Sequence, residues 1–467
     1  MFSMRRAQHV IFAALLAAAG QVLGEPLAAG STETFKDNLG ADGFVVREGT
    51  AGRFDPVREA CEGRFASALY LNQAAPYITF NPPPLEEQAP VFFPAAEFRL
   101  RPDEAVVVIG RTPPDTEYFS YQPYLSHTFR PEHPEEPLRG LNSVGDTINI
   151  STIETGGDEP FEREVVLIFT PDQNTEQRVR SALEAAGYPG EIINTLVIPD
   201  PMVTLGVDEA TDSFVLLHRM KQFTDPEAGD AFLNEPPMAV FRVTPEEATE
   251  SDPFPVPRLR VRGTGQTEFD LTPELARLRQ AVLDANPGMA VTEYETRSIG
   301  YEGFDQRPVN AWGDTRDTTQ LGMGFLPDFD MQHAMTLAED EYLIAYGVNH
   351  VATGKSTSMS INVYASETLK MAVGHAFVDQ LENSAQTLAG FTGPSADQMY
   401  AYKIARQCHG EPYCLELAAP PDCPVLQLDD DTQLGIGIRA YLEDETAVGP
   451  AVSEILYDRV IKFSPRD

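Results

Sequence analysis

Two apolar runs around a glycine turn, at residues 342–364, constrain the fold of this chain more than any other stretch. The turn falls at Thr353-Gly354-Lys355. Because successive side chains of a strand point to opposite faces, the pattern predicts a β-hairpin. One predicted face is apolar, with His350 at its rim. The other face carries Asn349, Ser358, Ser360, Asn362 and Tyr364. This polar face is either a solvated surface or the floor of a binding site.

Six elements are predicted between residues 160 and 245, in the order β-α-β-β-α-β. Strands are expected at 164–170, 192–198, 213–220 and 238–244, and helices at 174–186 and 226–233. This order is typical of a ferredoxin-like unit. In the second half, helices are expected at 272–285, 366–388 and 395–407, and neighbouring strands of one sheet at 434–442 and 454–463. The predicted fold class is therefore α+β with mixed or antiparallel sheets, with the ferredoxin-like unit in the first half and the hairpin in the second.

The chain of 467 residues is long enough for two or three domains. An acidic, proline-rich stretch at 246–257 is a candidate linker. It separates a predicted α+β domain at 25–245 from a second one at 258–467 that is built on the hairpin.

A targeting segment is predicted at residues 1–24. Arg5 and Arg6 precede an apolar run at 10–23, and Val22 and Gly24 suit positions −3 and −1 of a cleavage site. We therefore expect export to a secreted or periplasmic location. No later stretch reaches the roughly 18 consecutive apolar residues of a membrane span, so the mature chain is expected to be soluble.

The charge balance excludes one class of partner. The chain has 71 acidic and 34 basic residues, a formal net charge of −37. Nucleic acids bind to clustered Lys and Arg, so such an acidic protein is not expected to bind them. A small-molecule or polymeric substrate remains the expected partner.

Four cysteines in an exported chain predict two disulfides. One arrangement joins Cys408 to Cys414 and Cys61 to Cys423. A bridge between Cys414 and Cys423 is equally reasonable on spacing. The cysteines lack the close pairs of a zinc site, so no metal is predicted.

Tyrosines and a histidine gather at 118–127, and a carboxylate follows at Asp146. A histidine beside a carboxylate can act as a general base, because its pKa lies near neutral pH and the carboxylate orients its ring. His127 with Asp146, or His350, are the candidate catalytic residues. The candidate binding residues are Tyr118, Tyr121, Tyr124, Asn349, Ser360, Asn362 and Arg439. Arg439 is expected either to pair with a carboxylate of the protein or to hold a substrate carboxylate.

No GxSxG, HExxH or GxGxxG motif with the required context is present. The sequence favours an exported soluble enzyme, a hydrolase or lyase with His–carboxylate chemistry at a Tyr- and Asn-rich cleft. The alternative is an exported ligand-binding or surface protein without catalytic activity. The sequence specifies neither a cofactor nor an oligomeric state.

Overall fold

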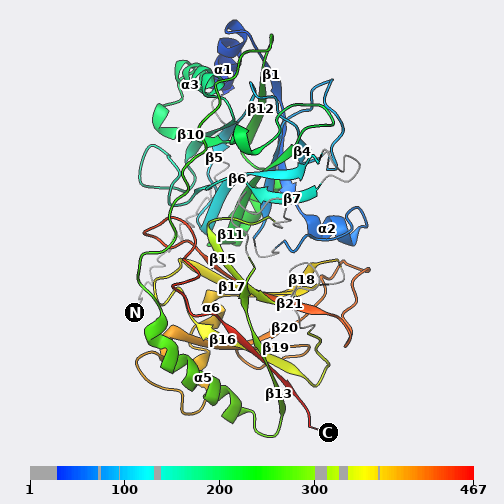
Figure 1. Ribbon diagram of the computed structural model, residues 1–467, viewed down its shortest axis with the longest axis vertical. Helices are drawn as coiled ribbons and strands as arrows, with labels where there is room; N and C mark the ends of the chain where they lie inside the picture. Colours follow the sequence, from blue (N-terminus) through cyan, green and yellow to red (C-terminus); the bar gives the residue numbers. More distant parts are fainter. Residues whose placement is uncertain are drawn as a thin grey trace, which may run out of the picture.

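A computed structural model describes residues 29–71, 75–93, 95–130, 138–299, 313–324, 335–366 and 369–466. The predicted signal peptide at 1–24 lies outside these residues. The described chain is a mixed α+β protein in which four β-sheets, here numbered I to IV, are stacked along the long axis (Figure 1). Among these residues, no helix is both long and apolar enough to span a bilayer.

The first half of the chain forms sheets I and II. Sheet I has the order β1 (Phe44–Glu48), β12 (Met238–Pro245), β5 (Ala105–Arg111), β9 (Glu164–Thr170) and β10 (Ile193–Val197). Sheet II has the order β2 (Thr50–Phe54), β3 (Tyr77–Asn81), β11 (Ser213–Phe223), β6 (Thr116–Thr128) and β7 (Leu138–Ser143). In addition, β4 (Glu97–Phe98) pairs with β11, and β8 (Ile148–Asn149) pairs with β6.

Sheet I is covered on both faces, which explains its continuous apolar strands. In β5, Val106 and Val108 face a core shared with sheet II. Val107 and Ile109 face a second core under α1 (Ala29–Ala41) and α3 (Gln173–Ala185). The short helices α2 (Pro56–Cys61) and α4 (Pro226–Asn234) complete the first half.

The second half of the chain forms sheets III and IV. Sheet III has the order β14 (Arg297–Ser298), β15 (Thr318–Met323), β21 (Leu434–Tyr441), β17 (Ser358–Ala365) and β18 (Met371–Phe377). Sheet IV has the order β13 (Ala290–Glu295), β22 (Arg459–Ser464), β16 (Tyr342–Val348), β19 (Met399–Ala405) and β20 (Cys414–Glu416). The two sheets share one core, and α5 (Thr272–Ala285) covers the other face of sheet IV. A short helix, α6 (Val378–Leu381), follows β18.

The predicted ferredoxin-like unit does not form, although its six elements occur in the expected order. A ferredoxin-like unit places all four strands in one sheet, whereas here β9, β10 and β12 belong to sheet I and β11 belongs to sheet II. The physical reason is the length of β11, which spans Ser213–Phe223 and pairs over most of its length with β6, a strand of 13 residues.

The predicted hairpin is also wrong, because β16 and β17 lie in different sheets. Asn349 ends β16 and accepts hydrogen bonds at Oδ1 from the backbone of Val351 (3.1 Å) and Ala352 (3.2 Å). The chain then crosses from sheet IV to sheet III. Both faces of β16 are apolar because α5 covers one of them and sheet III covers the other.

Two predicted helices in the second half are strands. The described residues of 366–388 contain β18, the short helix α6 and a 3-10 turn at Ala385–Thr387, and residues 395–407 contain β19 after a 3-10 turn at Ala396–Gln398. The strands predicted at 434–442 and 454–463 exist, but β21 lies in sheet III and β22 in sheet IV. Here tertiary pairing overrides local helix preference.

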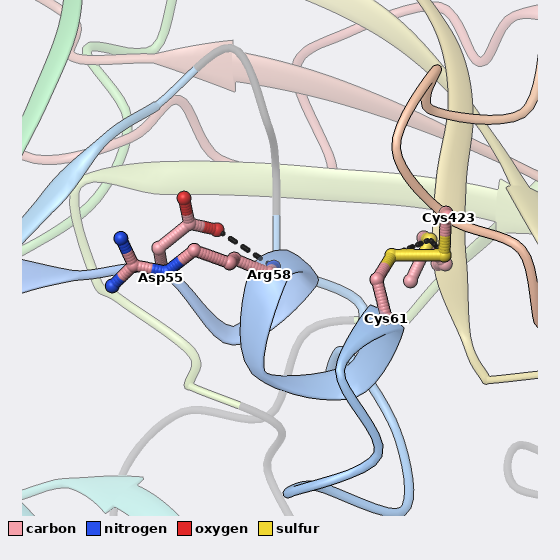
Figure 2. Close-up of a disulfide and its surroundings, with 5 residues drawn as sticks. Asp55, Arg58, Cys61 and Cys423 are labelled. Atoms are coloured by element: carbon pink, nitrogen blue, oxygen red, sulfur yellow. Dashed lines mark hydrogen bonds between the residues drawn. A yellow bond between two sulfur atoms is a disulfide. The ribbon is translucent and has the colours of Figure 1, made fainter.

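Two disulfides occur, Cys61–Cys423 and Cys408–Cys414, one of the arrangements open from the sequence. Cys61 ends α2 in the first half, and Cys423 lies in a loop of the second half (Figure 2). The bridge between them spans 362 residues of sequence and joins the two halves covalently.

Candidate functional site

Sheets II and III meet face to face, and the polar side chains between them form what we call the inter-sheet cluster. Sheet II contributes Tyr77, Tyr118, Ser120, Gln122, Tyr124, Arg219 and Lys221. Sheet III contributes Ser358, Ser360, Asn362, Tyr364, Arg439 and Tyr441. Side chains touch across the layer: the rings of Tyr118 and Tyr441 lie 4.8 Å apart, and Lys221 Nζ lies 3.3 Å from the Met359 carbonyl oxygen.

Strand alternation produces this polar layer. In β11, Leu216 and Met220 enter the core between sheets I and II, so Arg219 and Lys221 point the opposite way. In β21, Ile436 and Ile438 enter the core between sheets III and IV, so Arg439 and Tyr441 face sheet II. Arg439 is paired in register with two neutral polar residues, Ser360 on β17 and Gln320 on β15.

The arginines of the cluster lack carboxylate partners. Arg219 is 2% exposed and donates from Nη2 to Tyr124 Oη (3.0 Å) and to the Gly313 carbonyl (2.9 Å). Arg439 is partly buried and donates to the Tyr70 carbonyl at 3.4 Å. Within the described part of the chain, neither guanidinium forms an ion pair with a carboxylate.

Lys221 adds a third buried cation to the cluster. It contacts Ser358 Oγ and lies 3.4 Å from Glu117 Oε2, its one carboxylate neighbour among the described residues. Its Nζ also lies 5.1 Å from the ring centre of Tyr441. Burial lowers the pKa of Lys221, and Glu117 opposes that shift only in part.

Asp317 is the buried carboxylate nearest to Tyr118, and neutral groups hold it. It accepts hydrogen bonds from Tyr118 Oη (2.7 Å), Thr147 Oγ1 (2.6 Å) and Asn149 Nδ2 (3.1 Å). Burial raises the pKa of Asp317, and it also raises the pKa of Tyr118 well above its usual value, with Asp317 adding to the effect. Tyr118 therefore stays protonated at neutral pH.

Tyr441 has the opposite environment. Burial alone would raise its pKa, but the charges of Arg439, Arg219 and Lys221 outweigh burial and hold the pKa of Tyr441 below its usual value. Its hydroxyl is buried and has no hydrogen-bond partner among the described residues. The same holds for Tyr77 Oη, Gln122 Oε1, Arg219 Nε and Asn362 Oδ1.

A cavity of about 500 Å³ lies at the seam between the two halves and reaches the cluster at Tyr77. Its walls include Arg53 and Asp55 from the first half and Pro420 and Asp422 from the second, beside the Cys61–Cys423 bridge (Figure 2). The Tyr77 ring in turn lies 5.3 Å from the Arg219 guanidinium carbon. Tyr77 is thus the cluster residue that a small molecule in this cavity would contact, and its ring separates the cavity from Arg219.

The predicted pair of His127 and Asp146 does not form. His127 Nδ1 instead bonds to Glu97 Oε1 at 2.7 Å, and its ring stacks on Phe92 with centres 4.2 Å apart. Asp146 accepts from Arg316 Nε (2.6 Å) and from the backbone of Arg260 (2.6 Å). The two residues have separate partners and do not constitute one site.

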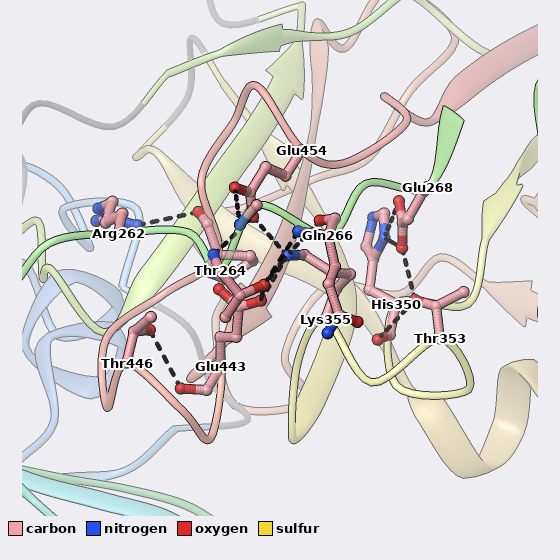
Figure 3. A network of polar contacts seen from close by, with 12 residues as sticks. Arg262, Thr264, Gln266, Glu268, His350, Thr353, Lys355, Glu443, Thr446 and Glu454 are labelled. Atoms are coloured by element: carbon pink, nitrogen blue, oxygen red, sulfur yellow. Dashed lines mark hydrogen bonds and ion pairs between the residues drawn. The ribbon is translucent and has the colours of Figure 1, made fainter. Parts of the chain in front are cut away.

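His350 is part of a buried charge network in the second half (Figure 3). Its Nδ1 lies 2.8 Å from Glu268 Oε1, and its Nε2 lies 3.6 Å from Asp458 Oδ2. Burial alone would lower the pKa of His350, but Glu268, supported by Asp458, raises it to about 10. The imidazole is therefore protonated at neutral pH and forms an ion pair there, so it is not available as a base.

The polar face predicted to hold Asn349, Ser360 and Asn362 together does not form, because the chain crosses from sheet IV to sheet III after Asn349. Asn349 caps the turn after β16, whereas Ser360 and Asn362 face sheet II. Tyr121 also leaves the predicted group, because it points into the core between sheets I and II and stacks on His218 at 4.1 Å. The structure thus brings together Tyr118, Tyr124, Ser360, Asn362 and Arg439 in the inter-sheet cluster, and it places His127, Asp146, His350, Tyr121 and Asn349 elsewhere.

Arg219, Lys221 and Tyr441 were not among the predicted site residues. The signal for them is in the sequence: basic side chains at alternating positions inside strands of a chain with few basic residues. Within the described residues, no group of three or more His, Cys, Asp or Glu side chains is arranged to hold a metal ion.

No protein-family model matches the chain, and no curated protein matches it. The VPA0106 protein from Vibrio parahaemolyticus is similar at 9% identity and a TM-score of 0.40, over 92% of this chain and 96% of that one. An uncharacterised protein from Burkholderia cenocepacia gives 13% identity and a TM-score of 0.37, over 92% of this chain and 87% of that one. Likenesses this low support no argument about function.

Proposed function

We propose that this protein is an exported ligand-binding protein that holds a small organic carboxylate between sheets II and III. The observation that carries the proposal is that Arg219 and Arg439 lie on facing sheets, near enough for their charges to repel, and that neither hydrogen-bonds to a carboxylate among the described residues. Burying a cation without a counter-charge is costly, so such positions are retained where an anion completes them. The disulfides are compatible with an oxidising compartment.

The composition strengthens this reasoning. The chain has 71 acidic residues for 34 basic ones, so carboxylates for pairing are abundant. Other buried arginines use them: Arg242 forms a two-point contact with Glu104, at 3.0 Å and 2.7 Å. Planar guanidinium groups bind carboxylates through paired hydrogen bonds, and two arginines that approach from opposite sides suit one such ligand.

The remaining side chains of the cluster favour a ligand with hydroxyl groups. Gln122, Asn362 and Tyr77 each carry a buried polar atom without a partner among the described residues. Tyrosine rings offer flat faces to a sugar ring, and amide groups bond to its hydroxyls. The seam cavity of about 500 Å³ has the size of a small-molecule site. A sugar acid or similar hydroxy carboxylate combines these properties.

Binding of galacturonate and glucuronate, compared with galactose and glucose, tests the proposal by calorimetry. We expect the acids to bind and the neutral sugars to bind at least about tenfold more weakly, because only the acids offer a carboxylate to the arginines. Arg219→Gln and Arg439→Gln should each weaken acid binding by more than about tenfold.

The matched control is Arg279→Gln, which removes a cation from an exposed pair with Glu293 on the far side of sheet IV. It should bind the acids as the unmodified protein does. Equal binding of acids and neutral sugars, or full binding by both cluster variants, would contradict the proposal.

A further inference from the structure

Tyr441 and Arg439 lie two residues apart on β21, so both side chains point toward sheet II. The Tyr441 hydroxyl is buried beside the Arg439 guanidinium, outside hydrogen-bond geometry, and Lys221 lies over the ring. Burial alone would raise the pKa of this phenol, but the three neighbouring cations favour its ionised form and hold the pKa below its usual value.

Resting on the proposed carboxylate binding, we infer that Tyr441 is the base of a β-elimination. It removes the proton from the carbon next to the ligand carboxylate while Arg219 and Arg439 hold the carboxylate oxygens. The substrate class is a sugar acid with an oxygen substituent on the carbon one further from the carboxylate.

The step balances without an external oxidant or reductant. The Tyr441 phenolate takes the proton, and the electron pair of the broken C–H bond moves toward the carboxylate, where the arginines stabilise the added charge. That pair then forms a carbon–carbon double bond as the bond from the neighbouring carbon to oxygen breaks. The leaving oxygen receives the proton from the Tyr441 hydroxyl, which restores the phenolate.

Two neighbouring groups are less suited to this role. Tyr118 touches Tyr441, but its hydroxyl donates a hydrogen bond to Asp317, and burial together with Asp317 holds its pKa well above the usual value. Two similar groups whose surroundings push their pKa values apart are the usual arrangement of an acid and a base. His375, paired in register with Asn362 at the edge of sheet III, stacks against Phe377 and is not adjacent to Arg439 in the sheet.

Exchange of the ligand proton in D₂O, followed by NMR, tests the inference directly. Galacturonate and its methyl glycoside are the probes, and the new double bond is followed by its ultraviolet absorbance. We expect the unmodified protein to exchange or eliminate, and Tyr441→Phe to bind the probes but to turn over at least about a hundredfold more slowly. His375→Asn should retain turnover.

The pH profile gives a second measurement that a purely structural tyrosine would not alter. The charged and titratable groups that face Tyr441 are Glu117, Tyr118, Arg219, Lys221, Tyr364 and Arg439. Turnover should rise with pH as Tyr441 ionises. Lys221→Met removes a neighbouring cation and should move this rise to higher pH.

The outcomes separate the inference from the binding proposal. Binding without exchange or elimination in the unmodified protein would overturn the role of Tyr441 and leave the binding proposal standing. Turnover by Tyr441→Phe at the full rate would also overturn it. Absence of binding to any acid would overturn both.

Discussion

At the scale of single residues, the charge state of a side chain follows from what encloses it. His350 and His218 are both buried, but His350 lies between two carboxylates and His218 lies among aromatic rings. The pKa of His350 is raised to about 10, whereas burial lowers that of His218 to about 3. The sequence alone shows two histidines in apolar strands and cannot distinguish them.

His350→Asn should destabilise the protein by about 3–5 kcal/mol, because Glu268 and Asp458 would lose their shared cation. The folded pKa of about 10 exceeds the ordinary 6.5, so this contribution is fully present below pH 6.5 and is lost as the pH rises toward 10. Urea unfolding between pH 6 and pH 10 should therefore show a decline in the unmodified protein that is smaller in the variant.

His409→Asn is the matched control for this measurement. His409 is exposed at the end of a strand connection, with φ of 52°, a conformation that asparagine also tolerates. A stability loss or a changed pH dependence in this control would show that the effect at His350 is not due to its ion pairs.

At the scale of elements, the sequence predicted some helices with nearly the right bounds. The helix predicted at 272–285 is α5 with the same bounds, and α3 begins and ends one residue before the prediction. The strands were also found as runs of alternating or continuous apolar residues. The pairing of the strands was not predicted correctly, because a turn such as the one after Asn349 can either close a hairpin or carry the chain from one sheet to another.

The N-cap of α3 offers a prediction at this scale. Asp172 is fully buried and accepts from the backbone N–H of Thr175 (2.8 Å) and of Asp252 (2.5 Å), so it anchors both the helix and the acidic stretch at 246–257. Asp172→Ala should lower the free energy of unfolding by about 1–3 kcal/mol, measured by urea titration.

Asp55→Ala is the comparison for that cap. Asp55 accepts only from the Arg58 backbone, at 3.0 Å, at the exposed start of the short helix α2. Its loss should cost less than the loss of Asp172. Equal costs would mean that the contact with Asp252 adds nothing.

At the scale of the whole molecule, the two disulfides differ in what they constrain. Cys61–Cys423 closes a loop of 362 residues, and Cys408–Cys414 closes one of 6. In the chain-entropy model, the long loop contributes about 6 kcal/mol and the short one about 2 kcal/mol. Replacing both cysteines of the long bridge with serine should therefore lower Tm more than the same change in the short bridge. The reverse order in thermal unfolding would contradict this.

The candidate site also depends on how whole sheets pack against each other, and for this reason the sequence predicted only part of it. Alternation correctly put Ser360 and Asn362 on one polar face, but only the contact of sheets II and III brings them to Tyr118 and Arg219. Tyr118, Arg219 and Ser360 are each more than 100 residues apart in the chain, so no periodicity of the sequence relates them. The histidines were selected by residue type, and their partners Glu97 and Glu268 come from distant segments.

The inward direction of Arg219 and Lys221 has an effect on the exterior. Cations that point between the sheets leave the surface dominated by acidic side chains, in a chain whose formal net charge is −37. An anionic molecule that diffuses toward the seam is therefore repelled before the interior arginines attract it. Dissolved ions shorten the range of that repulsion, so association of an anionic ligand should be faster at higher ionic strength.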